Sequence, residues 1–197
     1  LFQLAQRNAR GRRLGVVNAD DPHSVDFAAE TESSVSYGVE AGDVRATDVQ
    51  LRADCISYTA TAGTETYHIT SHLPGSFNVY NTLAAVCVGQ AVGLTREQVE
   101  QGIASLEGVE GRMATVDEGQ DFSVIVDFAH TPDSFEKLFK DLRPVVKGKL
   151  IVLFGSAGRR DEAKRAVQGK LAGEYADEVV VTEEDDRDCD GQEILEM

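Results

Sequence analysis

Three short apolar runs, separated by segments with helical spacing, constrain the fold of the second half of this chain most strongly. The runs cover residues 122–127, 150–154 and 178–182, and the helical segments cover residues 132–142 and 161–175. Near-continuous apolar strands are typical of parallel sheets that are buried on both faces. Alternation of strands with helices indicates right-handed crossovers. The pattern therefore predicts an α/β domain with a Rossmann-like, mostly parallel sheet.

The first half of the chain shows a different pattern. Residues 14–17 form a short apolar run that predicts a strand followed by a polar turn. Apolar and polar side chains alternate over residues 33–73, which predicts a small antiparallel β-meander with one solvated face. An Ala- and Val-rich segment then predicts a helix over residues 77–92. Thr95 and Gln98 form a capping-box pattern at the start of a second helix.

A domain boundary is expected near residue 110, where Gly108 and Gly111 indicate a hinge. We therefore expect one domain over residues 1–110 and another over residues 111–197. The chain begins and ends abruptly, so we expect both ends to lie within a longer protein.

The composition is that of a soluble globular protein with an acidic excess. Of the 197 residues, 42% are hydrophobic, and 34 Asp and Glu outnumber 19 Lys and Arg, giving a formal net charge of −15. Such a surface disfavours binding to nucleic acid and to anionic membranes. No apolar run approaches the roughly 20 residues of a membrane span, and no signal segment opens the chain.

The cysteines and histidines indicate no metal site. Cys55, Cys87 and Cys189 are odd in number and lack CxxC spacing, which is typical of a reducing cytoplasm rather than a disulfide framework. His68 and His72 lie in an expected strand, where four residues separate them by about 13 Å. We therefore expect no metal ligands among these side chains.

Polar residues gather where the first of the three runs ends. Asp127 closes the run, and Phe128 and His130 follow it. Thr131 and Pro132 form an N-cap followed by proline at the first helical position. Ligands of open α/β sheets bind beyond the carboxyl ends of the strands. Spacing alone leaves two interpretations open, a nucleotide-binding crevice or a helix cap with an ordinary turn histidine.

The next two strand ends repeat this arrangement. Residues 154–161 read FGSAGRRD, in which glycines let a ligand approach the backbone and Arg160 favours an anion. Residues 182–188 read TEEDDRD and include Asp185 and Arg187. Each motif alone is a weak signal. Three neighbouring polar strand ends together favour a shared binding crevice.

Five separated motifs, in this order, resemble the Mur ligase family over essentially the whole chain. They read LPGSFNVYNTLAAVCVGQAVG, GVEGRM, VDFAHTPDSFEKLF, LFGSAGRRDEAKR and ADEVVVTEEDDRDCDGQEI. Within that family they are most similar to the enzymes that add the third residue of the peptidoglycan stem peptide. The resemblance implies that residues 1–110 end a central ATP-binding domain and that residues 111–197 are most of a Rossmann-like C-terminal domain.

The resemblance implies an ATP-dependent amide-bond ligase of cell-wall synthesis in the cytoplasm, needed for cell shape and division. ATP phosphorylates the carboxylate of a UDP-MurNAc-dipeptide, and the amine of an amino acid attacks the acyl phosphate. Mg²⁺ stabilises the phosphoryl charge. The implied partners are these small molecules, with no nucleic acid and no membrane.

The resemblance also assigns roles to single residues. It implies ATP contacts for Asn81, Arg112, Asp127, Phe128 and His130, and contacts to the incoming amino acid for Arg160, Asp185 and Arg187. It assigns no catalytic residue and no metal ligand within this chain.

Three departures from the family pattern matter. The family's DNPR selectivity motif reads EDDR at residues 184–187. The identity of the incoming amino acid therefore stays open between diaminopimelate, lysine and another residue. The glycine loop reads SAGRRD where the family tends to GGDRD, which leaves Arg159 without a role. No GxxxxGK followed by Ser or Thr is present, so we expect the phosphate loop and magnesium ligands upstream. We expect this chain alone to lack ligase activity.

Two alternative functions stay open. One is another amide ligase of the same superfamily, of the folylpolyglutamate-synthetase or cyanophycin-synthetase kind. The other is a non-catalytic nucleotide-binding module that has kept the fold.

Overall fold

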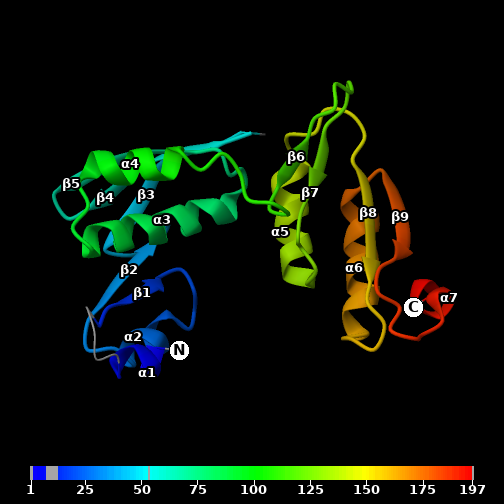
Figure 1. Cartoon of the computed structure of the whole chain (residues 1–197), viewed down its shortest axis with the longest axis horizontal. Helices are drawn as coiled ribbons and strands as arrows, with labels where there is room; N and C mark the ends of the chain where they lie inside the picture. The colour runs from blue at the N-terminus through cyan, green and yellow to red at the C-terminus, as the bar shows by residue number, and fades with distance from the viewer. Residues whose placement is uncertain (1, 8–12, 53, 197) are drawn as a thin grey trace. The chain divides into compact units, whose positions relative to one another are not determined.

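The computed structural model describes residues 2–7, 13–52 and 54–196 of the chain (Figure 1). The chain contacts divide it into two compact units, residues 1–126 and residues 127–197. Each unit is described by itself below. The expected domain boundary near residue 110 stays a prediction.

A five-stranded sheet in the order β1-β2-β3-β4-β5 organises the first unit. Strands β1, β2 and β3 run parallel, whereas β3, β4 and β5 form an antiparallel meander. The bounds of the strands are Gly15–Asn18 for β1, Ser34–Gly38 for β2, Val44–Leu51 for β3, Ile56–Ala62 for β4 and Glu65–Ser71 for β5. The antiparallel meander that the sequence predicts is therefore confirmed from β3 onward.

Strand β2 contradicts the expectation of one antiparallel meander over residues 33–73. It pairs parallel with both of its neighbours, and helix α2 (Ser24–Ala29) forms the connection from β1. The chain does not turn back into a hairpin after β2, and its next three backbone N–H groups donate to a side chain.

That side chain is Asp20, in the loop after β1. Its carboxylate accepts hydrogen bonds from the backbone N–H groups of Val39 at 2.7 Å, Glu40 at 3.1 Å and Ala41 at 3.0 Å. It also accepts a hydrogen bond from the Tyr80 hydroxyl at 3.1 Å. One carboxylate thus joins the β1–α2 loop, the β2–β3 loop and the helix that carries Tyr80.

Helices α3 (Ser76–Ala91) and α4 (Arg96–Ala104) pack on the sheet (Figure 1). Both helices are where the sequence predicts them, and the capping box of Thr95 and Gln98 is present. The core between α3 and the sheet consists of fully buried aliphatic side chains, including Ile56, Ile69, Leu83 and Val86. A short helix, α1 (Phe2–Gln6), lies near the start of the chain, and its Phe2 ring stacks on Phe27.

A small hairpin completes the first unit. Strand β6 (Ala114–Val116) pairs antiparallel with β7 (Val124–Val126). The sequence predicts residues 122–127 as a strand buried inside a parallel sheet, and this is wrong. Strand β7 is short and pairs antiparallel, and Phe122 is 65% exposed. The neighbouring Asp117–Gly119 turn closes a hairpin instead, which satisfies the β7 backbone locally.

The second unit has a parallel pair of strands and three helices. Its elements are α5 (Pro132–Leu142), β8 (Ile151–Ser156), α6 (Ala163–Tyr175), β9 (Glu178–Glu183) and α7 (Gly191–Glu196). Strands β8 and β9 pair parallel over their whole length. Helix α5 starts at the predicted residue, because the hydroxyl of Thr131 caps it in a capping box with Ser134 and proline follows at the first position.

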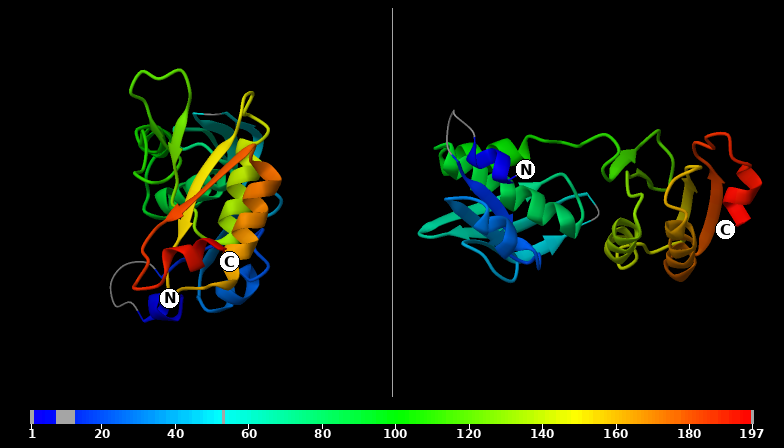
Figure 2. Two further views of the ribbon diagram at one scale, coloured as in Figure 1. Left: turned by 90° about the vertical axis from the view of Figure 1, so that its right-hand side faces the viewer. Right: turned by 90° about the horizontal axis from the view of Figure 1, so that it is seen from below.

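Helices α5 and α6 lie on the same side of the β8–β9 pair (Figure 2). Aromatic rings dominate the core between them: Phe135 contacts Phe139 and Phe154 edge to face, and Phe139 stacks on Tyr175. The prediction that these strands are buried on both faces is wrong. Side chains on the face away from the helices are exposed, with Ile151 at 57% and Leu153 at 67%. The predicted mixed α/β class is confirmed.

We predict that Asp20→Asn loosens the loop after β2. Partial burial alone would raise the pKa of Asp20, but its hydrogen bonds from the backbone and from Tyr80 outweigh burial and lower the pKa below the ordinary value. A lowered pKa means that the stabilisation is complete above the pKa of the unfolded chain and is lost as the pH falls through the lower folded-state value. The amide variant lacks this charge and should lose about 1–3 kcal/mol at pH 7.

Amide hydrogen exchange of Val39 and Ala41 measures this effect, together with urea unfolding at pH 7 and at pH 3. The stability difference between wild type and variant should shrink at pH 3. Asp26→Asn is the control, because Asp26 is exposed and contacts only His23 at 3.8 Å among the ion pairs of the described residues. Equal exchange rates in wild type and Asp20→Asn at pH 7 would contradict the role of Asp20.

Candidate functional site

The candidate residues fall into both units. Asn81 and Arg112 belong to the first unit, and the others belong to the second. The structure brings together the candidates of the loops after β8 and β9, and it brings Arg112 into a cavity.

The loop of residues 127–131 presents a carboxylate and two rings. The half-buried Asp127 accepts a hydrogen bond from the backbone N–H of Ala129 at 2.8 Å through Oδ1. The rings of Phe128 and His130 meet edge to face with centroids 4.9 Å apart, and both residues are exposed. An exposed aromatic pair beside a carboxylate can stack on a base and accept hydrogen bonds from hydroxyl groups.

Lys164 holds this loop against helix α6. Its Nζ donates a hydrogen bond to the backbone oxygen of His130 at 3.1 Å, and its side chain is half-buried. The sequence analysis missed Lys164, since a lysine in the first turn of a helix is common and only the folded chain shows its partner.

The loops after β8 and β9 form one surface because their backbones touch. The N–H of Gly158 donates to the backbone oxygen of Asp185 at 2.8 Å. A side chain at position 158 would overlap the backbone oxygen of Asp186. No other residue type leaves room for the second loop here, so Gly158 sets the distance between the two loops.

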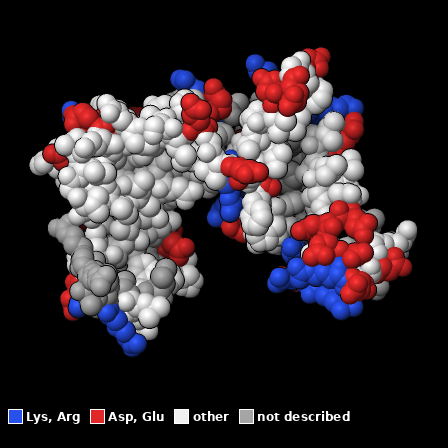
Figure 3. Space-filling view, viewed as in Figure 1, with Lys and Arg blue, Asp and Glu red and all other residues white. Residues whose placement is uncertain are grey.

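The charged groups on this surface are an ion pair between Arg187 and Asp185 and the exposed guanidinium group of Arg160. Arg187 Nε donates to Asp185 Oδ2 at 2.9 Å, and Arg160 is exposed on the neighbouring loop. Arg159 and Arg187 both have left-handed backbone conformations, with φ of 50° and 51°. Figure 3 shows basic and acidic side chains side by side at the end of the second unit where β8 and β9 end in Figure 1. Such a surface suits a ligand that carries both signs of charge.

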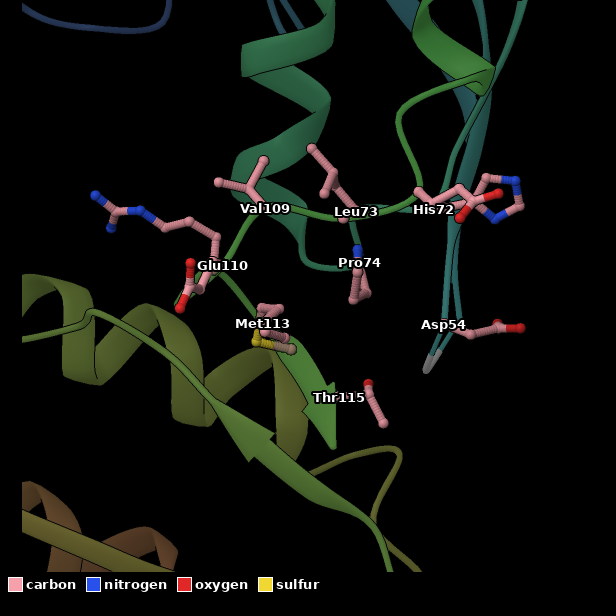
Figure 4. A pocket seen from close by; sticks show the side chains of 12 residues that line it. Asp54, His72, Leu73, Pro74, Val109, Glu110, Met113 and Thr115 are labelled. Atoms are coloured by element: carbon pink, nitrogen blue, oxygen red, sulfur yellow. The ribbon is translucent and has the colours of Figure 1, made fainter. Parts of the chain in front are cut away.

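A cavity of about 510 Å³ in the first unit contains Arg112. The segment that leads into α3 forms one wall, and the segment from α4 to β6 forms the other. Figure 4 shows Leu73, Pro74 and Met113 at the cavity. Leu73 and Met113 are apolar and almost fully buried, whereas Arg112 is exposed. The full lining is Asp54, His72, Leu73, Pro74, Glu107, Gly108, Val109, Glu110, Arg112, Met113, Ala114 and Thr115.

Asn81 lies on α3, one turn beyond the start of the helix. It is exposed, and its Nδ2 donates to Asn78 Oδ1 at 2.9 Å. Asn81 does not line the cavity.

The described residues do not form a metal centre. No group of three or more His, Cys, Asp and Glu side chains in residues 2–7, 13–52 and 54–196 lies close enough to hold a metal ion. Within the same ranges, no helix combines the length and the apolar character that crossing a bilayer requires.

Two family models match the chain. Residues 1–89 match the Mur ligase middle domain, and residues 111–197 match the Mur ligase glutamate ligase domain.

Curated relatives match along nearly the whole chain. The UDP-N-acetylmuramyl-tripeptide synthetase of Roseiflexus sp. is 44% identical over 190 residues, which are 94% of this chain and 37% of that protein. The UDP-N-acetylmuramoyl-L-alanyl-D-glutamate--2,6-diaminopimelate ligase of Geobacillus kaustophilus is 38% identical over 196 residues, 98% of this chain and 40% of that protein. The chain therefore spans well under half the length of these relatives.

Solved structures share the fold. The UDP-N-acetylmuramate-alanine ligase MurC of Thermotoga maritima superposes with a TM-score of 0.75 at 25% identity, covering 99% of this chain and 42% of that one. The MurF ligase of Thermotoga maritima in complex with ADP superposes with a TM-score of 0.72 at 19% identity, covering 90% and 42%. These neighbours support the Rossmann-like class of the second half.

We predict that Gly158→Ala separates the loops after β8 and β9. The added methyl group overlaps the backbone oxygen of Asp186, so the bond from Gly158 to Asp185 must break. Backbone amide chemical shifts of residues 184–190 should change, and their exchange should become faster. Gly173→Ala in α6 is the matched control, because nothing lies within 4 Å of its added Cβ. The control should gain up to about 1 kcal/mol of stability. Unchanged shifts at residues 184–190 in Gly158→Ala would contradict this account.

Proposed function

The chain belongs to the Mur ligase family, and we propose that the longer protein containing it is an ATP-dependent amide-bond ligase of peptidoglycan synthesis. The γ-phosphoryl group of ATP passes to the carboxylate of a UDP-MurNAc-dipeptide, which releases ADP. The amine of an amino acid then attacks the acyl phosphate, forms the amide bond and releases phosphate and a proton. The name and 44% identity of the Roseiflexus relative support this reaction.

One observation carries the proposal for this chain. The loops after the parallel strands β8 and β9 are joined through Gly158 and Asp185, so their charged side chains share one surface. The carboxyl ends of parallel strands are the place where open α/β sheets bind their ligands. A helix cap or a solubilising acidic loop does not require this contact between two loops.

Nucleotide contacts are proposed for residues of each unit, and each set is taken by itself. Asp127 accepts hydrogen bonds from the ribose hydroxyls, and the exposed rings of Phe128 and His130 lie beside it. Arg112 binds the phosphates, since a guanidinium group matches phosphate oxygens in bidentate fashion. Asn81 contacts the adenine base. The role proposed for these residues is to bind and orient the nucleotide.

The incoming amino acid is proposed to be a diamino acid, a class that includes diaminopimelate and lysine. Arg160 and Arg187 bind its carboxylate through their planar forks. Asp185 already accepts from Arg187 at 2.9 Å and attracts an amine. The Geobacillus relative is named as a diaminopimelate ligase, which is a member of the same class.

Magnesium would neutralise phosphate charge during the transfer. Its ligands are proposed to lie in the part of the protein outside this chain, because the described residues form no metal-binding group. We place the reaction in the cytoplasm, where ATP and UDP-sugar substrates are available, as part of cell-wall biogenesis, cell shape and division. The net charge of −15 fits small-molecule partners better than nucleic acid or a membrane.

We predict that Asp127→Ala weakens ADP binding by this chain about tenfold. The estimate corresponds to the loss of hydrogen bonds to a charged group. Titration of ADP into labelled chain, followed by NMR, measures the affinity. Asp133→Ala is the control: Asp133 lies six residues away, is 75% exposed and pairs with Lys137 at 3.0 Å. An Asp127→Ala affinity equal to that of the wild type would remove Asp127 from the nucleotide site.

In the full-length protein, Arg187→Ala should raise the KM for the amino acid about tenfold or more and leave the KM for ATP unchanged. The reason is the loss of one charge-assisted contact to the carboxylate. Steady-state kinetics with UDP-MurNAc-dipeptide test this, with Arg96→Ala as control, since Arg96 is exposed and pairs with Glu97.

The same assay separates the alternatives. Turnover of a glutamyl-folate but not of a UDP-muramyl peptide would assign another branch of the superfamily. No turnover, together with no phosphate-loop lysine before Leu1 in the full-length sequence, would favour a non-catalytic nucleotide-binding module.

A further inference from the structure

The side-chain amides of Asn78 and Asn81, in the first two turns of α3, form a chain of hydrogen bonds with the backbone oxygen of Pro74. We call this chain of hydrogen bonds the relay. Asn78 Nδ2 donates to the backbone oxygen of Pro74 at 2.7 Å. Asn81 Nδ2 donates to Asn78 Oδ1 at 2.9 Å. Asn78 is buried, with 4% exposure, whereas Asn81 is exposed.

The chemistry of the relay permits one orientation for each amide. The oxygen of Pro74 can only accept, so Asn78 must turn its NH₂ group towards it. The oxygen of Asn78 then faces Asn81, and it too can only accept. Asn81 must therefore present its NH₂ group inward, which leaves its Oδ1 and the second Nδ2 hydrogen for a ligand.

The backbone that carries the relay is held firmly. The hydroxyl of Thr82 donates to the backbone oxygen of Asn78 at 2.7 Å and contacts the buried Tyr58 hydroxyl at 2.8 Å. Pro74 is buried next to Gly75, whose φ of 101° directs the chain into the helix. A fixed backbone and a buried first amide leave Asn81 little freedom to rotate.

We propose that Asn78 is a positioning residue that sets the orientation of the Asn81 amide and thereby selects a 6-amino purine over a 6-oxo purine. This inference rests on the proposed function, in which Asn81 meets the base of ATP. Adenine presents an N6 donor next to the N7 acceptor, and an asparagine with one free oxygen and one free N–H matches both. Hypoxanthine presents two acceptors, O6 and N7. The fixed Oδ1 of Asn81 is itself an acceptor, so it would be repelled by the O6 atom and could form no hydrogen bond with it.

Affinities of the full chain for ADP and for inosine diphosphate test this selection. The wild type should prefer ADP at least about fivefold, the lower end for one bidentate contact to a base. Asn78→Ala frees the Asn81 amide to turn, so the variant should bind ADP about two- to fivefold more weakly and lose most of its preference.

Val86→Ala is the matched control. Val86 is a buried residue of the same helix, about two turns beyond Asn78, and its aliphatic side chain makes no hydrogen bond to either amide of the relay. The control should lose stability and keep the wild-type preference for ADP. A loss of preference that is equal in both variants would overturn the role of Asn78.

The NMR signals of the side-chain amides provide a second readout that needs no ligand. In the wild type, one hydrogen of the Asn81 NH₂ group should exchange slowly with water, and Asn78→Ala should abolish this protection. Absence of ADP binding by the wild-type chain and by the full-length protein alike would overturn the proposed function. Binding of ADP with an unchanged preference and an unchanged Asn81 signal in Asn78→Ala would overturn only the positioning role.

Discussion

Backbone N–H groups in the loops need hydrogen-bond acceptors, and the arrangement of this chain depends on how carboxylates supply them. Asp20 accepts hydrogen bonds from three consecutive N–H groups in the loop that follows β2. Asp43 receives the N–H of Ser36 within the same region. In the second unit, Asp177 receives the N–H of Leu150 at 2.7 Å while it pairs with Arg143. The acidic excess of the composition is thus more than a solubilising surface, because several of these carboxylates hold strands in place.

Local signals allowed the helices to be predicted from the sequence, whereas strand partners could not be. The start of α5 follows from Thr131 and Pro132, which act within a few residues of each other. The partner of a strand depends on contacts far along the chain. The loop after β2 donates hydrogen bonds to Asp20, some twenty residues earlier in the chain, and β2 pairs parallel with strands on both sides. Apolar runs alone do not carry this information.

The same limit applies to the candidate site. The glycine loop and the acidic loop are visible in the sequence as polar strand ends, but the contact between Gly158 and Asp185 is not. Lys164 and Asn78 belong to no local sequence motif. Each donates a hydrogen bond to a backbone oxygen, and that contact is visible only in the folded chain. Polar residues at the ends of strands are therefore easier to identify in the sequence than residues such as Lys164, which holds a loop in place.

The contact at Gly158 has a consequence for any exchange of specificity between relatives. A carbonyl group of one loop occupies the space where a side chain of the other would stand. The two loops therefore have to be exchanged together. A loop from a relative that was introduced alone would not fit the backbone of the loop that was kept. Swapping residues 155–160 together with residues 183–190 respects that fit.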